Sequence, residues 1–353
     1  MHTDLAHLSA AALLAIPPKQ PECLFNGSAG DIKQAYRLLA MKWHPDRSTD
    51  PDAHAVFQHI KCLYEQAGVP SAPGNGQLQL TALDGKRYDI NYLRCHRFEL
   101  GSLYVAGTVA AFVIDRDHAD LVQRAERTIA SLDYPNDRMR SQVAPHLPAY
   151  PFAGAFQTDS AYVIVMRKSP DQLLLRDVLD HFGGRLDPRH VAWVVSSLLN
   201  LCCYLQYAGI AHNALSPDTC FMSPQAHSMA ILGGWWYAAG AGMPMVAAPA
   251  STLDWGPHDL MATKRASIRT DLELVRAIGR ELLGDIGGSR LADGGGVPRA
   301  FVHWLRLPAS NDAIDEYRTW RTQVLHDSFG ARRFAELPLT QSDIYAVDPQ
   351  YTI

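Results

Sequence analysis

Two amphipathic helical patterns lie on either side of a short, proline-containing turn near the start of the chain. In the first pattern, apolar residues recur every three or four positions, which is the period of one helix face. These residues are Ile32, Ala35, Tyr36, Leu39, Ala40 and Trp43. Pro45 disfavours helical geometry in the residue before it, so the helix is predicted to end near His44.

A second helix is predicted to begin at Pro51, with Asp50 as its cap, because proline is well tolerated at the first helical position. Its apolar face consists of Val56, Phe57, Ile60, Leu63 and Tyr64. The loop 44–50 is short enough for the two helices to pair antiparallel. The N-terminal part of the chain is therefore predicted to be a compact helical unit.

The stretch AYRLLAMKWHPDR (35–47) resembles the second helix and loop of J domains, the co-chaperone modules that stimulate DnaK-type ATPases. AHAVFQHIKCLYEQ, the following helix, resembles the third helix of that family. The resemblance implies that a basic helix face docks on the chaperone and that the HPD aspartate triggers ATP hydrolysis. Such charged contacts give steering and register. The residues assigned to chaperone binding are His44, Pro45, Asp46, Lys33, Arg37, Lys42 and Arg47.

Two departures from the J-domain pattern stand out. The position after Arg37, often basic in the family, is Leu38. The first helix of the family is expected near 10–25, and that stretch matches poorly. The first departure implies weaker docking or a specialised chaperone partner.

The composition changes after the helical unit. A stretch rich in Gly, Pro, Ser and Asn is typical of a linker. Short apolar runs then predict mostly strands, and the C-terminal half is predicted to be mostly helical. The expected domains are an N-terminal extension at 1–20, a J domain at 21–67, a linker at 68–77, a large domain at 78–335 and a loosely structured tail at 336–353.

The large domain resembles a protein kinase. The run VIVM (163–166) corresponds to the strand entering the hinge, and residues 188–208 correspond to a long buried helix. HNALSPDT (212–219) stands where the family has HRDLKPEN. TDLELVRAIGRELLGD (270–285) resembles the F helix, in which Asp271 would anchor the 212–214 loop by hydrogen bonds.

These resemblances imply an α+β chain. An all-α J domain, built as an antiparallel helical hairpin, is followed by a two-lobed protein-kinase-like fold. The N-lobe is expected at about 78–166 and the C-lobe at about 167–335.

The groups that perform phosphoryl transfer in the family are missing at the matching positions. Ala214 replaces the catalytic aspartate, and a methyl group accepts no proton. No carboxylate is present at the metal-binding positions to hold magnesium. The strand 109–114 has no lysine. The degenerate positions are Phe112, His212, Ala214, Thr219, Leu232, Gly233 and Gly234.

The sequence thus resembles a co-chaperone fused to a pseudokinase that uses no cofactor and has no catalytic residues. The expected partners are a DnaK-type chaperone and an unknown client or scaffold protein. One alternative is a divergent kinase-like phosphotransferase that uses other carboxylates. The candidates are Asp115, Asp117, Asp254 and Asp259. Another alternative is an interaction protein whose J domain docks without stimulating hydrolysis.

Charge and residue composition argue against several other functions. A net charge of -4 argues against a general nucleic-acid binder. The 6 cysteines form no CxxC pair, so reduced thiols and a cytoplasmic location are expected. The 15 histidines form no HxxxH or HExxH pair, and no metal site is predicted. The apolar run 191–211 contains polar residues and is predicted to be a buried helix, not a membrane span.

The run Trp235-Trp236-Tyr237 follows the degenerate metal-binding position. Two interpretations remain open for it. The three rings either fill the vacated nucleotide cleft or form an exposed anchor for a partner.

Overall fold

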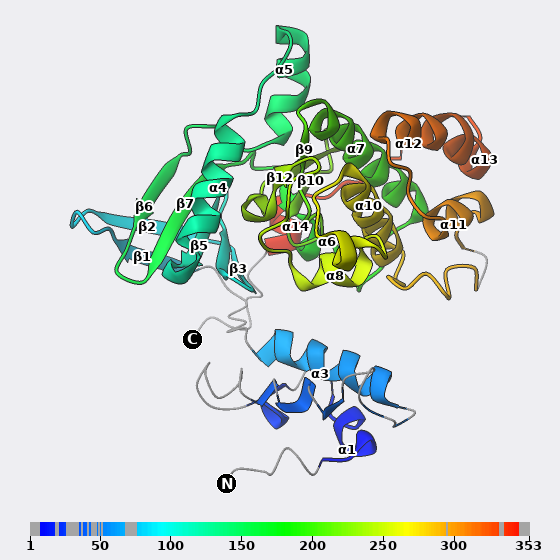
Figure 1. Cartoon of the computed structure of the whole chain (residues 1–353), viewed down its shortest axis with the longest axis horizontal. Coiled ribbons are helices and arrows are strands. Elements are labelled where there is room, and N and C mark those ends of the chain that lie inside the picture. Colours follow the sequence, from blue (N-terminus) through cyan, green and yellow to red (C-terminus); the bar gives the residue numbers. More distant parts are fainter. Residues whose placement is uncertain are drawn as a thin grey trace. The chain divides into compact units, whose positions relative to one another are not determined.

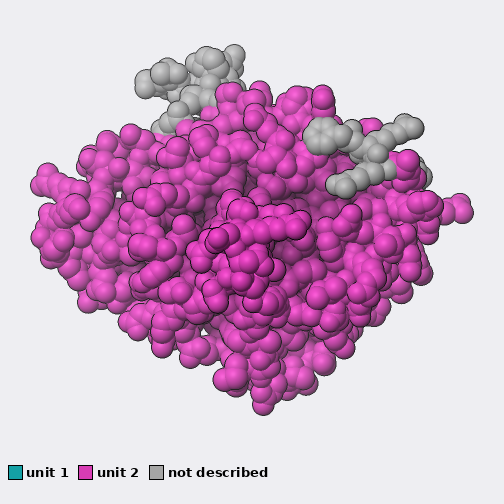
Figure 2. Space-filling model, turned by 90° about the horizontal axis from the view of Figure 1, so that it is seen from above, with its two compact units in different colours: residues 1–73, 95–97 teal, residues 74–94, 98–353 magenta. Residues whose placement is uncertain are grey.

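A computed structural model of the chain describes residues 8–17, 21–25, 35–36, 38–40, 42–43, 48, 50, 52–67, 76–293, 296–331 and 335–345. The chain divides into two compact units. Residues 1–73 and 95–97 form the first, and residues 74–94 and 98–353 form the second (Figure 1). Figure 2 shows one face of the second unit.

The N-terminal segment of the first unit is helical and has its own apolar core, whereas residues 95–97 lie in a strand. Among the residues described at 35–42, all are helical. Its other helices are α1 (Ala10–Leu14), the 3₁₀ helix η2 (Pro21–Cys23) and α3 (Ala53–Ala67). The core combines the two predicted helix faces with residues before them. It consists of Ala10, Leu13, Leu24, Phe25, Leu39, Trp43, Ala53, Val56, Ile60 and Leu63.

The second unit begins with an antiparallel hairpin of β1 (Gly76–Thr81) and β2 (Arg87–Tyr92). Gly76 pairs with Tyr92, and Thr81 pairs with Arg87. Because Gly76 and Gln77 lie in a strand, the predicted linker at 68–77 is too long at its C-terminal end. The rest of that linker lies outside the described residues.

A five-stranded sheet follows, with the strand order β3-β4-β5-β7-β6. The pairs β4–β5, β5–β7 and β7–β6 are antiparallel. The strands are β3 (Arg94–Phe98), β4 (Gly101–Val105), β5 (Val109–Asp115), β6 (Gly154–Gln157) and β7 (Ala161–Arg167). The prediction of mostly strands before residue 165 is therefore confirmed.

Helical elements connect β5 to β6. They are η3 (Arg116–His118), α4 (Ala119–Ala130), α5 (Asp137–Val143) and η4 (Ala144–His146). In Figure 1, α4 lies against one face of the sheet. Its buried face, which includes Leu121, Ala125 and Ile129, shares one core with Phe112 and Ile114 of β5.

The C-terminal part is mainly helical, as predicted. Helix α7 (Pro188–Tyr207) lies beside α10 (Ile268–Leu282), and both have buried faces. The other helices are α6 (Leu175–His181), α8 (Ala250–Trp255), α9 (Leu260–Thr263), α11 (Arg299–Arg306), α12 (Ala313–Thr319), the π-helix η6 (Trp320–Val324) and α13 (Leu325–Phe329). No helix in the described ranges is long and apolar enough to span a membrane, and 191–211 falls largely within α7.

Short strands accompany these helices. One sheet has the order β11-β10-β8, and β12 pairs with β9. Their bounds are β8 (Leu173–Leu174), β9 (Ile210–Ala211), β10 (Cys220–Ser223), β11 (Ser228–Ile231) and β12 (Ala239–Gly240). The last element before β12 is the 3₁₀ helix η5 (Trp235–Tyr237).

The expectation of a loosely structured tail after residue 336 is wrong for residues 337–345. Helix α14 (Gln341–Tyr345) lies there, and four apolar side chains of this stretch are buried in the core of the second unit. They are Leu337, Leu339, Ile344 and Tyr345. The apolar surface that they bury stabilises this stretch against the rest of the unit.

Candidate functional site

The residues assigned to chaperone binding lie in the first unit. Lys42 is described, and its Nζ donates a hydrogen bond to the backbone oxygen of Leu8 at 2.8 Å. The same ammonium group lies 4.9 Å from the ring centre of Trp43. The remaining assigned residues lie outside the described ranges. They are Lys33, Arg37, His44, Pro45, Asp46 and Arg47.

Packing around these positions holds the helix that leads into the turn. Leu39 and Trp43 are 1% and 4% exposed, whereas Leu38 is 55% exposed. The Tyr36 ring stacks on Tyr64 of α3, with ring centres 4.0 Å apart. The helical residues before the predicted turn and helix α3 after it therefore share buried and stacked side chains.

In the second unit, Asp271 is buried on α10 under the 212–219 loop. Its Oδ2 accepts a hydrogen bond from the backbone N–H of His212 at 2.8 Å. Its Oδ1 accepts one from the N–H of Asn213 at 2.7 Å. Burial raises the pKa of Asp271 to about 7, although both N–H donors act to lower it. This is the contact that the kinase resemblance implied for Asp271.

His212 is buried as well, and it connects the loop to Gly233. Its Nε2 lies 3.0 Å from the Gly233 carbonyl oxygen. Burial lowers the pKa of His212 to about 4, so the ring is neutral at pH 7. A carbonyl oxygen only accepts, so Nε2 carries the proton and donates. The His212 ring also meets the edge of Trp235, with ring centres 5.1 Å apart.

Asn213 has a left-handed backbone conformation, with φ of 61°. Asparagine adopts this region more readily than most residues. Its side-chain amide donates to the carbonyl oxygens of Ala211 at 3.1 Å and Tyr237 at 3.2 Å. Thr252 Oγ1 donates to the Asn213 carbonyl oxygen at 2.7 Å. These bonds leave little freedom in the backbone of the loop.

At Ala214, which the kinase resemblance aligns with the catalytic aspartate, the buried methyl group offers no acid or base. Thr219 Oγ1 donates to the Ala214 carbonyl oxygen at 2.8 Å and accepts from the Ser216 N–H at 3.0 Å. The threonine hydroxyl therefore closes the loop on itself.

Gly233 and Gly234 pack directly against this loop. A Cβ at Gly233 would lie 3.1 Å from Thr219 Cα. A Cβ at Gly234, where φ is +80°, would lie 2.8 Å from His212 Cε1. A side chain at Gly234 would require His212 to shift, and one at Gly233 would press on the Thr219 backbone, so a carboxylate fits at neither position without rearrangement.

Three aromatic rings fill the space between the sheet and η5. Trp236 stacks on Phe98 of β3 and meets the edge of Phe112 of β5, with both ring-centre distances 5.1 Å. Trp235, Trp236 and Tyr237 are 0%, 3% and 7% exposed. The interpretation of these rings as an exposed anchor is therefore wrong. The Trp236 ring packs against β5, the strand in which the sequence has no lysine.

Sequence reasoning missed two features of this region. Nothing in the sequence marked Phe98 as a partner of Trp236. The second feature is Asp177, which accepts a hydrogen bond from Tyr345 Oη at 2.9 Å and pairs with Arg94 at 3.3 Å. The closely spaced apolar residues of the tail were the signal that could have revealed it.

Within the described residues, no group of three or more His, Cys, Asp or Glu side chains is arranged to hold a metal ion. The four carboxylates of the phosphotransferase alternative lie outside the 212–219 loop. Asp115, Asp117, Asp254 and Asp259 are all exposed.

Comparison with known proteins finds similarity in the first unit. Residues 24–67 match the family model described as the DnaJ domain. The chain is 44% identical over 52 residues to Chaperone protein DnaJ 1 of Aromatoleum aromaticum, covering 14% of this chain and 15% of that protein. It is 50% identical over 46 residues to Chaperone protein DnaJ of Cupriavidus taiwanensis, covering 13% of this chain and 12% of that protein. It is 48% identical over 40 residues to DnaJ homolog subfamily C member 16 of Gallus gallus, covering 11% of this chain and 5% of that protein. The chain thus spans a small part of each of these relatives.

Proposed function

We propose that this chain, whose residues 24–67 form a J domain, is a co-chaperone that recruits a DnaK-type chaperone and stimulates its ATPase. In this proposal the second unit is a catalytically inactive, kinase-like module that binds a client or scaffold protein. The J domain is the observation that carries the proposal, because a J domain implies a DnaK-type partner.

The contacts under the 212–219 loop support the kinase-like part of the proposal. In the protein kinase family, the aspartate at the start of the F helix holds the catalytic loop by its backbone. Asp271 makes two such bonds, at 2.8 and 2.7 Å. The order of elements agrees with the resemblance too, because a sheet with α4 is followed by α7, the loop and α10.

The absence of catalysis is also a proposal. It is supported by Ala214 and by the hydroxyl of Thr219, which is bonded within its own loop. Trp236 and Phe112 pack together where a nucleotide would need space. Losing one group that stabilises a transition state typically costs about 10²–10³ in rate, and several are missing here. We further propose a cytoplasmic location, in which the cysteines stay reduced.

The test is ATP hydrolysis by a purified DnaK-type chaperone, followed by phosphate release in the presence of the full chain. The wild type should accelerate hydrolysis, and His44→Gln or Asp46→Asn should abolish the acceleration. Asp52→Asn is the matched control, because Asp52 is an exposed carboxylate of the same unit. Rising salt should weaken stimulation, since charges are screened over about 8–10 Å at physiological ionic strength. Equal stimulation by the wild type and the Asp46→Asn variant would refute the assignment.

A further inference from the structure

A cavity of about 460 Å³ lies in the second unit, and no residue of the 212–219 loop lines it. Gln206 at the end of α7, Ile210 of β9 and Asn311 before α12 line it, together with residues at the start of α10. Sites for small ligands and side chains commonly have volumes of about 300–1,000 Å³. We call this cavity the α10 pocket.

The charged lining of the α10 pocket favours an anion. Its lining contains two arginines, Arg265 and Arg269, and one acidic residue, Asp259, while Glu273 pairs with Arg269 from outside the lining. Arg265 Nη1 donates to the Gly242 carbonyl oxygen at 2.6 Å. Arg269 makes only long ion pairs, at 3.9 Å to Asp259 and 4.0 Å to Glu273. Its Nε is buried and has no hydrogen-bond acceptor among the described residues. The Nη groups of Arg269 also make no hydrogen bond to a described residue, so the guanidinium keeps donor capacity that a carboxylate would use.

Exposed apolar side chains follow the lining residues in the chain. Met243 follows Gly242, and Met261 follows Leu260; both methionines are 59% exposed. Tyr207, which follows Gln206, is 56% exposed. Ile314 is 52% exposed and follows Ala313, whose N–H bonds to Gln206. Methionine side chains adapt to varied partners, so the two exposed methionines are suited to contact a bound segment.

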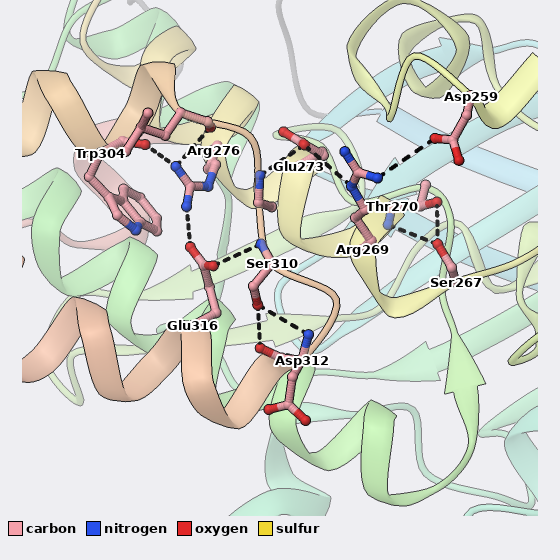
Figure 3. A network of polar contacts seen from close by, with 12 residues as sticks. Asp259, Ser267, Arg269, Thr270, Glu273, Arg276, Trp304, Ser310, Asp312 and Glu316 are labelled. Atoms are coloured by element: carbon pink, nitrogen blue, oxygen red, sulfur yellow. Dashed lines mark hydrogen bonds and ion pairs between the residues drawn. The ribbon is translucent and has the colours of Figure 1, made fainter.

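The wall of the pocket that carries Asn311 is held by a polar network (Figure 3). Glu273 Oε1 accepts from the N–H of Ala309 at 2.9 Å, and Glu316 Oε2 accepts from the N–H of Ser310 at 3.0 Å. Glu316 also pairs with buried Arg276. This network fixes the loop before α12, so the site is formed before any ligand arrives, which lowers the entropic cost of binding.

We propose that the α10 pocket binds a short client segment in which one carboxylate lies beside large apolar side chains. The carboxylate would accept hydrogen bonds from Arg269, and the apolar side chains would cover Met243 and Met261. This proposal rests on the proposed function, because it assigns the client-binding role of the second unit to a defined site.

The test uses the full chain and three fluorescein-labelled peptides in fluorescence anisotropy. The first peptide is Gly-Ser-Leu-Phe-Asp-Leu-Met-Ser-Gly. In the second, asparagine replaces aspartate, and in the third, serine replaces the four apolar residues. The first should bind, the second about tenfold more weakly because a charge-assisted bond is lost, and the third should not bind measurably.

Variants of the full chain locate the binding site. Arg269→Gln should remove the tenfold preference for aspartate over asparagine, and Arg299→Gln, an exposed arginine of α11, should leave it unchanged. Met243→Ser combined with Met261→Ser should weaken the first peptide at least tenfold. Leu83→Ser is the matched control for that pair, since Leu83 is 54% exposed on the β1–β2 turn. Melting temperatures verify that each variant is folded.

The outcomes separate this inference from the proposed function. If none of the peptides binds, or if binding is the same in the Arg269→Gln and methionine variants, the α10 pocket is not the client site. Stimulation of the chaperone ATPase tests the co-chaperone role independently, because neither set of substitutions touches the J domain. Peptide binding without any stimulation of the chaperone ATPase would overturn the co-chaperone role but would still support the α10 pocket as a binding site.

Discussion

The Asp271 carboxylate holds two consecutive backbone N–H groups, those of His212 and Asn213. A simpler role as the cap of α10 does not apply to it. Ser267 is the N-cap, and its Oγ accepts from the N–H of Thr270 at 3.3 Å. The contribution of Asp271 to stability therefore comes from the loop that it anchors.

Replacing Asp271 with alanine should lower the free energy of unfolding of the second unit. Each buried donor left unpaired costs about 1–3 kcal/mol. Asp271→Ser should be equally destabilised, because a serine side chain is too short to reach both N–H groups. Denaturant unfolding followed by tryptophan fluorescence measures this, since 6 of the 7 tryptophans (all but Trp43) lie in the second unit. The exposed Asp315→Ala serves as control. A serine variant as stable as the wild type would exclude the anchoring role.

His212 makes the stability of the second unit depend on pH. Its folded pKa of about 4 lies below the ordinary histidine value of 6.5, so the native state binds fewer protons than the unfolded state between these values. The contribution of His212 to the free energy of unfolding is therefore complete above pH 6.5 and is lost as the pH falls toward 4. In His212→Gln this titration is absent.

The stability difference between the wild type and His212→Gln should shrink as the pH falls from 7.5 to 5. Comparing the two proteins cancels the opposing titration of Asp271, whose raised pKa is common to both. Melting temperatures at half-unit pH steps give the measurement. A difference that stays constant over this range would mean that His212 is not held neutral by burial.

At the scale of elements, periodicity in the sequence predicted the helices well. Leu39, Val56 and Ile60 are buried as their spacing required. Helix α7 lies over Pro188–Tyr207, close to the predicted 188–208. Helix α6 begins only at Leu175, because Leu173 and Leu174 pair with β10 as a strand. That pairing is a tertiary contact, which local pattern does not encode.

The site was predictable where a role depends on the order of elements, and unpredictable where it depends on packing. Asp271 was anticipated from its place at the start of a helix that follows a recognisable loop. Phe98 was not, because its partner Trp236 is far away in the sequence. The choice between a filled cleft and an exposed anchor likewise needed the positions of both rings, which composition alone does not supply.

Helix α14 is tied to the rest of the second unit by Tyr345. The Tyr345 hydroxyl donates to Asp177 at 2.9 Å and accepts from the N–H of Leu174 at 3.3 Å. Tyr345→Phe should therefore reduce the free energy of unfolding by about 1–3 kcal/mol, because buried polar groups lose a partner. Tyr207→Phe, at a tyrosine 56% exposed, should have little effect in the same denaturation assay. Equal stability of Tyr345→Phe and the wild type would show that α14 contributes only apolar contacts.

At the scale of the whole molecule, two units with separate cores are joined in one chain. The proposed roles are correspondingly separable, with chaperone stimulation in the first unit and client binding in the second. Under this division, the second unit needs no nucleotide, and its aromatic rings contribute to packing. The phosphotransferase alternative makes the opposite demand, because it requires ATP and a metal ion to bind.

ATP with magnesium should leave the melting temperature of the full chain unchanged. A ligand at about 100 times its dissociation constant adds about 2.7 kcal/mol to stability, so real binding would be visible as a shift. An active protein kinase measured alongside supplies the positive control.

Ala214→Asp should not create nucleotide binding or phosphate transfer, because the lysine and both metal ligands would still be missing. That variant should also melt earlier than the wild type, since Ala214 is 2% exposed and a buried, unpaired carboxylate is destabilising. A clear upward shift with ATP and magnesium in the wild type would favour the phosphotransferase over the pseudokinase.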